Sequence, residues 1–145
     1  MTHLPIHVDI WGGERGLIKV TLREADTFGF TEMGKTFPET KAWLLAYLER
    51  KKGALPPLDF SDLSLFTVEV LSSLKTIPLG KTLSYAEVAE RLARPHAARA
   101  VGRACGSNPF ALFIPCHRVI ASGGHLGGYG FGLEVKKKLL DHELT

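Results

Sequence analysis

Residues 51–57 divide the chain into two stretches with different hydrophobic patterns, and this division limits the possible folds more than any other feature. The segment reads Lys-Lys-Gly-Ala-Leu-Pro-Pro, and glycine and proline disfavour the interior of both helices and strands. We therefore expect two units in the chain of 145 residues, a small one over residues 1–57 and a larger one over residues 58–145.

The pattern before this segment predicts a small sheet followed by one helix. Apolar runs at residues 6–11 and 17–22 flank a cluster of glycines, which is typical of a β-hairpin. Residues 38–52 carry apolar side chains at helical spacing, at Trp43, Leu44, Tyr47 and Leu48.

The pattern after the segment is mainly helical. Apolar residues between 66 and 74 predict one helix, and Ser84 with Glu87 forms a capping box that opens a second helix through residue 92. A break at Arg94 and Pro95 precedes a helix over residues 96–105, so these two helices resemble a helix-turn-helix. A last helix is expected over residues 133–144, which makes the fold class α+β.

Charge and cysteine content limit the partners and the compartment. The stretch from residue 91 to residue 133 contains five arginines and no acidic residue, which suits nucleic acid or else a solvated face balanced by acids from elsewhere in the chain. No apolar run is long enough to span a membrane, and two cysteines are too few for a disulfide framework. We expect a cytosolic protein, or a nuclear one in a eukaryote, with reduced thiols.

Cys116 is the candidate nucleophile. A cysteine in an apolar run is usually an inert core residue, but His117 and Arg118 follow it directly. A thiol becomes reactive when a base or a nearby positive charge favours its thiolate. The neighbouring residues therefore favour a catalytic role without establishing that they touch the thiol.

The C-terminal helix supplies a second candidate. One face of this predicted helix is mainly apolar but also contains a carboxylate; it carries Leu133, Lys136, Leu139, Leu140 and Glu143. A buried charge needs a partner, and a carboxylate that orients an imidazole would complete a relay of Cys116, His117 and Glu143. A frayed last turn, or an ion pair between Glu143 and a surface arginine, would explain the same pattern.

The helix over residues 96–105 is rich in small side chains, with Ala98, Ala100, Gly102 and Ala104 among them. Small residues allow close approach, either to another helix or to a ligand.

Residues 114–120, Ile-Pro-Cys-His-Arg-Val-Ile, resemble the active-site signature of the O6-alkylguanine-DNA alkyltransferases. Further segments match that family in register, from about residue 58 to the C-terminus: Ser84-Tyr85, residues 98–102, Asn108-Pro109, Gly127-Gly128-Tyr129, and Lys136 through Leu139-Leu140 to Glu143.

This resemblance implies a role for each matching residue. Cys116 would accept the alkyl group, activated by His117 through a water, with Glu143 orienting the imidazole. Asn108 would hold the turn of the loop, and Tyr85 would contact phosphate and donate a proton to guanine. Arg99 would enter the base stack when the target nucleotide leaves it.

The resemblance also implies a DNA face, a base pocket and a fold. The remaining DNA-contacting positions are Thr67, Ala86, Arg94, Ala98, Gly102 and Ser122. The pocket for guanine would be lined by Val119, Tyr129, Gly130 and Phe131. The N-terminal unit would be RNase H-like and the C-terminal unit winged-helix-like.

The implied activity is stoichiometric, irreversible transfer of a methyl or other alkyl group from O6-alkylguanine, and from O4-alkylthymine, to Cys116, by a monomer acting on double-stranded DNA. No cofactor is implied. The zinc-binding residues of some relatives have no counterpart, so no metal is expected, and Gly130 stands where several relatives carry serine, which affects alkyl preference.

Three other functions fit parts of the pattern. An alkyltransferase-like protein would bind the lesion without reacting, although such proteins replace the cysteine. A helix-turn-helix transcription factor would bind by sequence instead of by lesion. A cysteine hydrolase built from the same three residues would turn over many times on an ester or amide.

Overall fold

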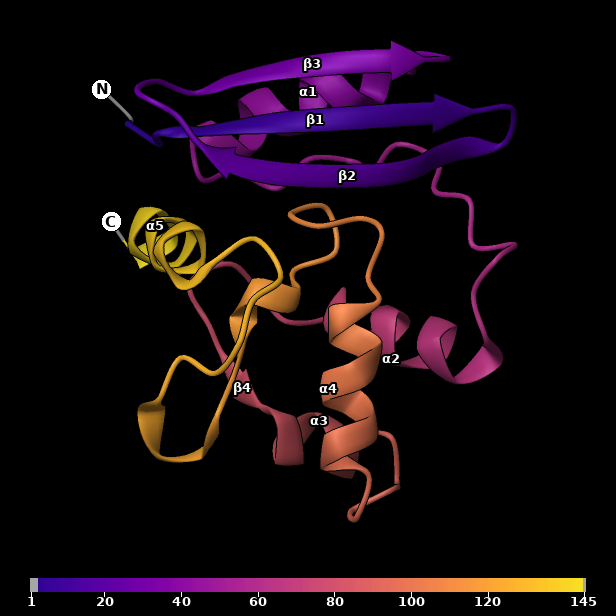
Figure 1. The fold of residues 1–145 in the computed structure, drawn as a ribbon, viewed down its shortest axis with the longest axis vertical. Coiled ribbons are helices and arrows are strands. Elements are labelled where there is room, and N and C mark those ends of the chain that lie inside the picture. Colours follow the sequence, from indigo (N-terminus) through magenta and orange to yellow (C-terminus); the bar gives the residue numbers. More distant parts are fainter. Residues whose placement is uncertain (1–2, 145) are drawn as a thin grey trace.

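The computed structural model describes residues 3–144 as a mixed α+β fold, which confirms the predicted class. A three-stranded sheet with helix α1 forms one end of the molecule, and α2, α3 and α4 lie at the other (Figure 1). Helix α5 lies beside strand β2, between these two parts.

The sheet has the order β2-β1-β3. Strand β1 (Ile6–Gly13) pairs antiparallel with β2 (Gly16–Glu24), which confirms the predicted hairpin, and parallel with β3 (Gly29–Gly34), which the sequence pattern did not predict. Alternate side chains of β1 are buried, as expected for a strand with one face on the core: Ile6, Val8 and Ile10.

Helix α1 (Pro38–Leu48) covers the buried face of this sheet with Leu44 and Tyr47. The helix ends four residues before the predicted limit, because Arg50 adopts a left-handed backbone with φ of 56°. The N–H of Arg50 then donates to the Tyr47 carbonyl at 2.9 Å, and that of Lys51 to the Ala46 carbonyl at 2.8 Å. These two bonds are the pattern that ends many helices.

The segment after α1 remains attached to the sheet. The Leu17 N–H donates to the Pro57 carbonyl at 2.8 Å, and the Asp59 N–H donates to the Leu17 carbonyl at 2.9 Å. Further along β2, the Val20 N–H donates to the Pro109 carbonyl at 2.7 Å. The sheet and the helical part therefore share one continuous core.

The helices of the second part follow the sequence pattern closely. They are α2 (Leu65–Leu74), α3 (Tyr85–Arg91), α4 (Ala98–Gly106) and α5 (Leu133–Leu144). The predicted capping box is present, since the Glu87 N–H donates to Ser84 Oγ at 3.1 Å and the Ser84 N–H donates to Glu87 Oε1 at 2.9 Å. Helix α4 packs against both α2 and α3, and α3 and α4 form the helix-turn-helix.

Two short elements complete this part. Strand β4 (Leu83–Ser84) pairs in parallel with β5 (Val119–Ile120), which places the start of α3 beside the loop that contains Cys116.

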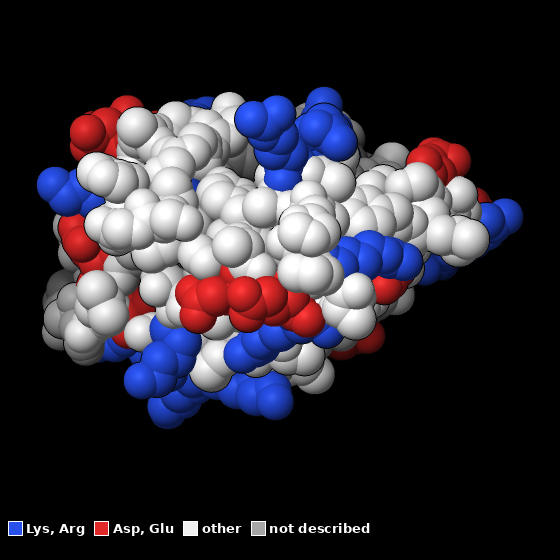
Figure 2. Space-filling model, turned by 90° about the horizontal axis from the view of Figure 1, so that it is seen from below, with Lys and Arg blue, Asp and Glu red and all other residues white. Residues whose placement is uncertain are grey.

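The acid-free stretch does not make a uniformly basic surface. Seen from the end that carries α3 and α4, most of the surface is uncharged, and lysine and arginine form separate groups with acidic side chains between them (Figure 2). Arg94 pairs with Glu69 at 2.9 Å and Arg118 with Glu143 at 2.6 Å, so acids from outside the stretch balance two of its five arginines. Arg99 and Arg103 are exposed and make no ion pair with any residue in the described range 3–144.

Candidate active site

The loop between α4 and β5 is held by Asn108. Its side-chain amide donates from Nδ2 to the Ile114 carbonyl at 3.1 Å, and its Oδ1 accepts from the Phe110 N–H at 2.9 Å. Between these anchors Leu112 adopts a left-handed backbone with φ of 75°. The amide therefore fixes a tight turn that leads into the short 3₁₀ helix η1 (Cys116–Arg118).

Cys116 begins η1 and is 7% exposed. Burial raises the pKa of its thiol above the ordinary value, and the opposing influences of Asn108, Lys136 and Tyr129 do not cancel that rise. The resting group at neutral pH is therefore the thiol, and reaction at the sulfur needs a base.

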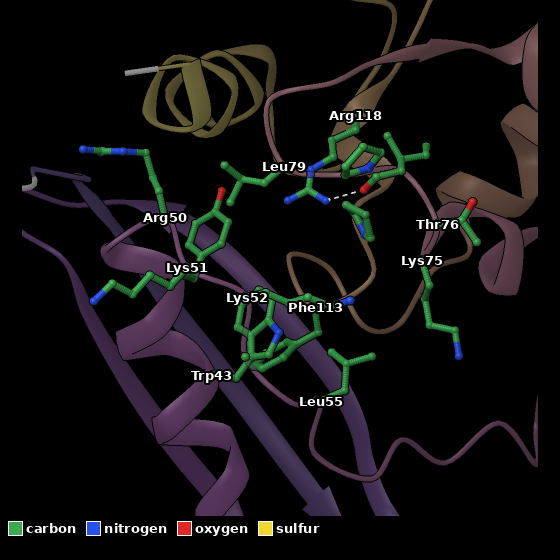
Figure 3. Close-up of a pocket in the computed structure, with 15 residues that line it drawn as sticks. Trp43, Arg50, Lys51, Lys52, Leu55, Lys75, Thr76, Leu79, Phe113 and Arg118 are labelled. Atoms are coloured by element: carbon green, nitrogen blue, oxygen red, sulfur yellow. Dashed lines mark hydrogen bonds between the residues drawn. The ribbon is translucent and has the colours of Figure 1, made fainter.

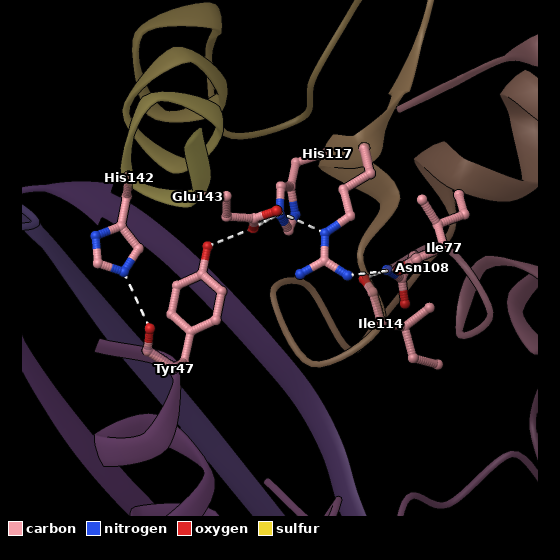
Figure 4. A network of polar contacts seen from close by, with 8 residues as sticks. Tyr47, Ile77, Asn108, Ile114, His117, His142 and Glu143 are labelled. Carbon is pink, nitrogen blue, oxygen red and sulfur yellow. Dashed lines mark hydrogen bonds and ion pairs between the residues drawn. The ribbon is translucent and has the colours of Figure 1, made fainter. Parts of the chain in front are cut away.

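A candidate for that base, His117, lies in a buried network around Glu143 (Figure 4). The His117 ring approaches Glu143 Oε2 through Nε2 at 2.5 Å, and Arg118 donates from Nε to Glu143 Oε1 at 2.6 Å. Tyr47, from the N-terminal part, donates its hydroxyl to Glu143 Oε2 at 2.6 Å. Three side chains thus hold one carboxylate, and His117 and Glu143 are brought together as the relay requires.

The protonation states follow from these contacts. Burial opposes ionisation of Glu143, but the hydrogen bonds and charges of His117 and Arg118 outweigh it and lower its pKa to about 2. Burial lowers the pKa of His117 despite the neighbouring carboxylate, so the ring is neutral at pH 7. A carboxylate accepts only, so the single ring proton is on Nε2 and Nδ1 is the free base.

His117 Nδ1 is buried and has no hydrogen-bond partner among the described residues. A proton acceptor needs an unpaired basic nitrogen, and His117, which follows Cys116 in the chain, supplies one.

Arg118 does not lie against the thiol, contrary to the simplest expectation from its place in the sequence. Its guanidinium is committed to Glu143 and, from Nη1 at 2.7 Å, to the Ile77 carbonyl. The positive charge that partly offsets the effect of burial on the pKa of Cys116 is that of Lys136 on α5.

Lys136 is fully buried and holds the wall of the site. Its Nζ donates to the carbonyls of Val119 at 2.8 Å, Leu126 at 2.5 Å and Gly128 at 3.1 Å. The glycine-rich segment after β5 is therefore fixed by a single ammonium group that satisfies three carbonyls.

The buried face of α5 is rotated from the predicted one. Lys136, Leu139 and Glu143 are buried as expected, but Leu133 is 50% exposed and Leu140 is only partly buried. Val135 and His142 take their places, because His142 Nε2 lies 3.0 Å from the Tyr47 carbonyl and anchors this side of the helix.

A cavity of about 440 Å³ opens onto Cys116. Three residues expected there, Tyr129, Gly130 and Phe131, line it, whereas Val119 is buried outside it and contributes its carbonyl to Lys136. The remaining lining residues come from α3, α4 and the adjoining loops: Tyr85, Gly102, Cys105, Gly106, Asn108 and Gly128. Sequence reasoning did not include Cys105, although its helical spacing from Gly102 places both on one side of α4.

The remaining expected DNA-contacting residues are spread over the α2, α3 and α4 end. Thr67 lines a shallow separate hollow of about 190 Å³ with Ala100 and Arg103. Arg94 lies over the Phe66 ring and pairs with Glu69. Ala86 and Ala98 are half-buried and Ser122 is exposed, and none of them lines the cavity at Cys116.

Within residues 3–144, no helix is both long and apolar enough to cross a membrane.

Comparison with known proteins agrees with this arrangement. The family model described as "6-O-methylguanine DNA methyltransferase, DNA binding domain" matches residues 65–145. A methylated-DNA-protein-cysteine methyltransferase of Mycolicibacterium paratuberculosis is 46% identical over 120 residues, covering 81% of this chain and 71% of the relative. One from Shigella flexneri is 51% identical over 78 residues, which are 54% of this chain and 46% of that protein.

The crystal structure of Mycobacterium tuberculosis OGT in complex with DNA superimposes with a TM-score of 0.72 at 33% identity, over 95% of this chain and 92% of that one. The chain therefore belongs to the O6-alkylguanine-DNA alkyltransferase family.

Proposed function

We propose that this protein repairs alkylated DNA by direct reversal, moving the alkyl group from O6 of guanine, and from O4 of thymine, onto Cys116. One observation carries the proposal: the Cys116 thiol opens onto a cavity of about 440 Å³ and is followed in the chain by a neutral, carboxylate-bound histidine. The names of the relatives and the DNA bound to one of them support it.

The first step is removal of the thiol proton. His117 Nδ1 takes the proton from Cys116 Sγ, through a bridging water, and the ring becomes an imidazolium. The Glu143 carboxylate at Nε2 stabilises that positive charge, and Arg118 and Tyr47 keep the carboxylate ionised and in place.

The second step is displacement at the alkyl carbon. The sulfur lone pair forms a bond to carbon while the carbon–O6 bond breaks, and its electron pair passes to the guanine ring. Tyr85, which lines the cavity, donates a proton to the departing base and so limits the charge that develops on it. The product is a thioether without an activated centre that water could attack, so each protein molecule reacts once.

Access to O6 requires the nucleotide to leave the duplex. The small residues of α4 allow this helix to approach the minor groove, which is only about 6 Å wide. Arg99 is exposed on the same helix, and we assign it to the gap left in the base stack. Contacts of this kind go mainly to the DNA backbone, which suits a protein that must act at any sequence.

The alternative function, lesion binding without transfer, is less well supported because the cysteine is present and opens onto the cavity. Because the proposed substrate is DNA, we infer a location in the cytoplasm, or in the nucleus of a eukaryote.

The test separates binding from chemistry. Cys116→Ala should bind duplex DNA containing O6-methylguanine as tightly as the wild type, because the helix-turn-helix does not depend on the thiol, and it should transfer no methyl group. Transfer by Cys116→Ala at the wild-type rate would refute the proposal, as would a wild-type protein that binds the lesion and leaves it intact.

A further inference from the structure

Tyr47 on α1 and His117 on η1 share one oxygen of the Glu143 carboxylate. The Tyr47 hydroxyl donates to Oε2 at 2.6 Å, and the His117 ring approaches the same Oε2 through Nε2 at 2.5 Å. Arg118 donates to the other oxygen, Oε1, at 2.6 Å. Among the side chains of residues 3–144, therefore, only Tyr47 shares its acceptor atom with the imidazole.

The Tyr47 ring is held in place by other aromatic rings. It stacks on Trp43, one turn earlier in α1, with 5.3 Å between the ring centroids, and Trp43 in turn contacts Phe113 at 4.5 Å. These rings line a cavity of about 550 Å³ where the sheet-and-helix part meets the second part (Figure 3). The His142 ring of α5 lies 5.2 Å from the Tyr47 ring. Packing from α1, α5 and the loop before η1 thus fixes where the hydroxyl lies.

Both partners in the contact between Tyr47 and Glu143 keep their protonation states across the pH range of the reaction. Burial, with a further contribution from the Glu143 charge, raises the pKa of Tyr47 well above its ordinary value, so the hydroxyl remains a donor. Glu143, with a pKa of about 2, remains a carboxylate. The hydrogen bond between them is therefore present whether His117 is neutral or protonated.

Four groups besides Tyr47 act on the His117 ring. Burial is the main cause of the lowered pKa of His117, and the charges of Arg118 on η1 and Lys136 on α5 lower it further. The Glu143 carboxylate opposes them and raises it. Cys116, the remaining titratable residue of η1, is a neutral thiol at rest. Glu143 is thus the one of these groups that favours protonation of the ring.

A second donor on Oε2 weakens that effect of Glu143. Each hydrogen bond takes up part of the negative charge of the oxygen, so the Tyr47 hydroxyl leaves less of it for the imidazolium that forms when His117 accepts a proton. The imidazolium is then less stable, and the ring is a weaker base. His117 consequently stays neutral, the state that can accept a proton, down to a lower pH.

We propose that Tyr47 is a positioning residue for transfer to Cys116: its hydroxyl holds Glu143 Oε2 at His117 Nε2 and takes up part of that oxygen's charge, which keeps the imidazole unprotonated until the thiol proton arrives. This role rests on the proposed alkyl-transfer function. It gives the sheet-and-helix part a share in the reaction, although Cys116, His117 and Glu143 all belong to the second part.

The pH dependence of alkylation by free O6-benzylguanine tests this role. Tyr47→Phe leaves His117 as the only donor on Oε2, so the pKa of His117 should rise. The fall of the rate on the acid side should then begin about one pH unit higher than in the wild type, a shift of the size expected for one lost charge-assisted hydrogen bond. A fall at the wild-type pH would overturn the proposal even if the rate were lower at every pH, because a purely structural tyrosine would cause such a uniform loss.

Thr40→Val is the matched control. Thr40 is fully buried on the same helix, and its hydroxyl has no hydrogen-bond partner among the described residues. The substitution removes a buried hydroxyl from α1 and leaves the network around Glu143 intact, so the acid side of the profile should coincide with that of the wild type. A shift equal to that of Tyr47→Phe would mean that a movement of α1 alters the site, and would overturn the proposal.

A second readout does not depend on alkyl transfer. The NMR resonance of the proton on His117 Nε2 moves downfield as its hydrogen bond to Glu143 strengthens, and His117→Ala assigns the signal. At pH 7 this resonance should lie further downfield in unreacted Tyr47→Phe than in the wild type or Thr40→Val, and an unchanged resonance would overturn the proposal. If the wild type transferred no alkyl group from the free base or from DNA, the proposed function would fail, and the resonance would still decide the role of Tyr47.

Discussion

Tyr47 donates its hydroxyl to the same Glu143 oxygen that the His117 ring contacts, so a residue of the N-terminal part completes the network beside Cys116. Tyr47 and Glu143 are 96 positions apart in the chain, and both are almost fully buried. The sheet-and-helix part therefore helps to position the relay as well as stabilising the core.

Tyr47→Phe should lower the free energy of unfolding by about 2 kcal/mol, because it removes a buried hydrogen bond to a charged acceptor. Tyr129→Phe is the matched control: the hydrogen-bonding neighbour of the Tyr129 hydroxyl is the Cys116 thiol, a weak partner compared with a carboxylate, so its removal should cost much less. Chemical denaturation of the two variants measures the difference. Equal losses of unfolding free energy in the two variants would show that the hydrogen bond from Tyr47 to Glu143 adds nothing to stability.

The pH dependence of alkylation should reveal the base. In the wild type the rate should be constant around neutral pH and fall only below about pH 6.5, because burial lowers the pKa of His117. His117→Ala must ionise the thiol directly, and burial raises the pKa of that thiol. Its rate should be lower at pH 7 and rise about tenfold per pH unit toward pH 9.

Glu143→Gln tests the same relay through its orienting group and should reduce the rate at pH 7 with partial recovery at higher pH. Rates are measured with free O6-benzylguanine, which requires no DNA. Profiles that coincide with the wild type in both variants would remove His117 and Glu143 from the proton path.

Acid stability should depend on Glu143. Its pKa of about 2 in the folded protein lies below the ordinary value of 4.5, so its ionised form stabilises the fold above pH 4.5, and this contribution is lost as the pH falls from 4.5 toward 2. Wild-type unfolding free energies should therefore fall across that range by a few kcal/mol more than those of Glu143→Gln, in which the group cannot titrate. Parallel curves for the two proteins would contradict the lowered pKa.

Most helices were predictable because their signals are local. The capping box at Ser84 and Glu87 and the break at Arg94 and Pro95 are formed by neighbouring residues, so each element could be read directly. Strand β3 was missed because its residues, Gly-Phe-Thr-Glu-Met-Gly, are half-buried or exposed and lack a clean apolar alternation.

The site was predictable where the family motif carries it and not where distant parts of the chain meet. His117 and Glu143 were paired in advance because a buried carboxylate needs a partner. The contact of Tyr47 with Glu143, and the role of Lys136 as the charge near the thiol, depend on how α1 and α5 pack around the loop. A helical wheel also could not fix the rotation of α5, which the contact of His142 with Tyr47 sets.

Arg99→Ala should separate base extrusion from chemistry. If Arg99 holds the extruded state by filling the vacated stack, the variant should lose rate on duplex DNA and keep a near wild-type rate on free O6-benzylguanine, which needs no extrusion. Arg103→Ala, at the other exposed arginine of α4, is the comparison for a simple phosphate contact and should only weaken DNA binding and flatten its salt dependence. Equal losses on both substrates would show that Arg99 supports the fold or the thiol instead.

The most direct test of the account is the number and position of methyl groups transferred from DNA containing O6-methylguanine. Cys105 is an internal control for this measurement, because its thiol lines the same cavity as Cys116. Burial raises the pKa of Cys105 to about 12, so this thiol should stay protonated and unreactive. Fragment-ion mass spectrometry can assign the methyl group to one cysteine or the other after incubation with excess substrate. The account predicts one methyl group per protein, on Cys116 alone; continued turnover, or a methyl group on Cys105 in the wild type, would contradict it.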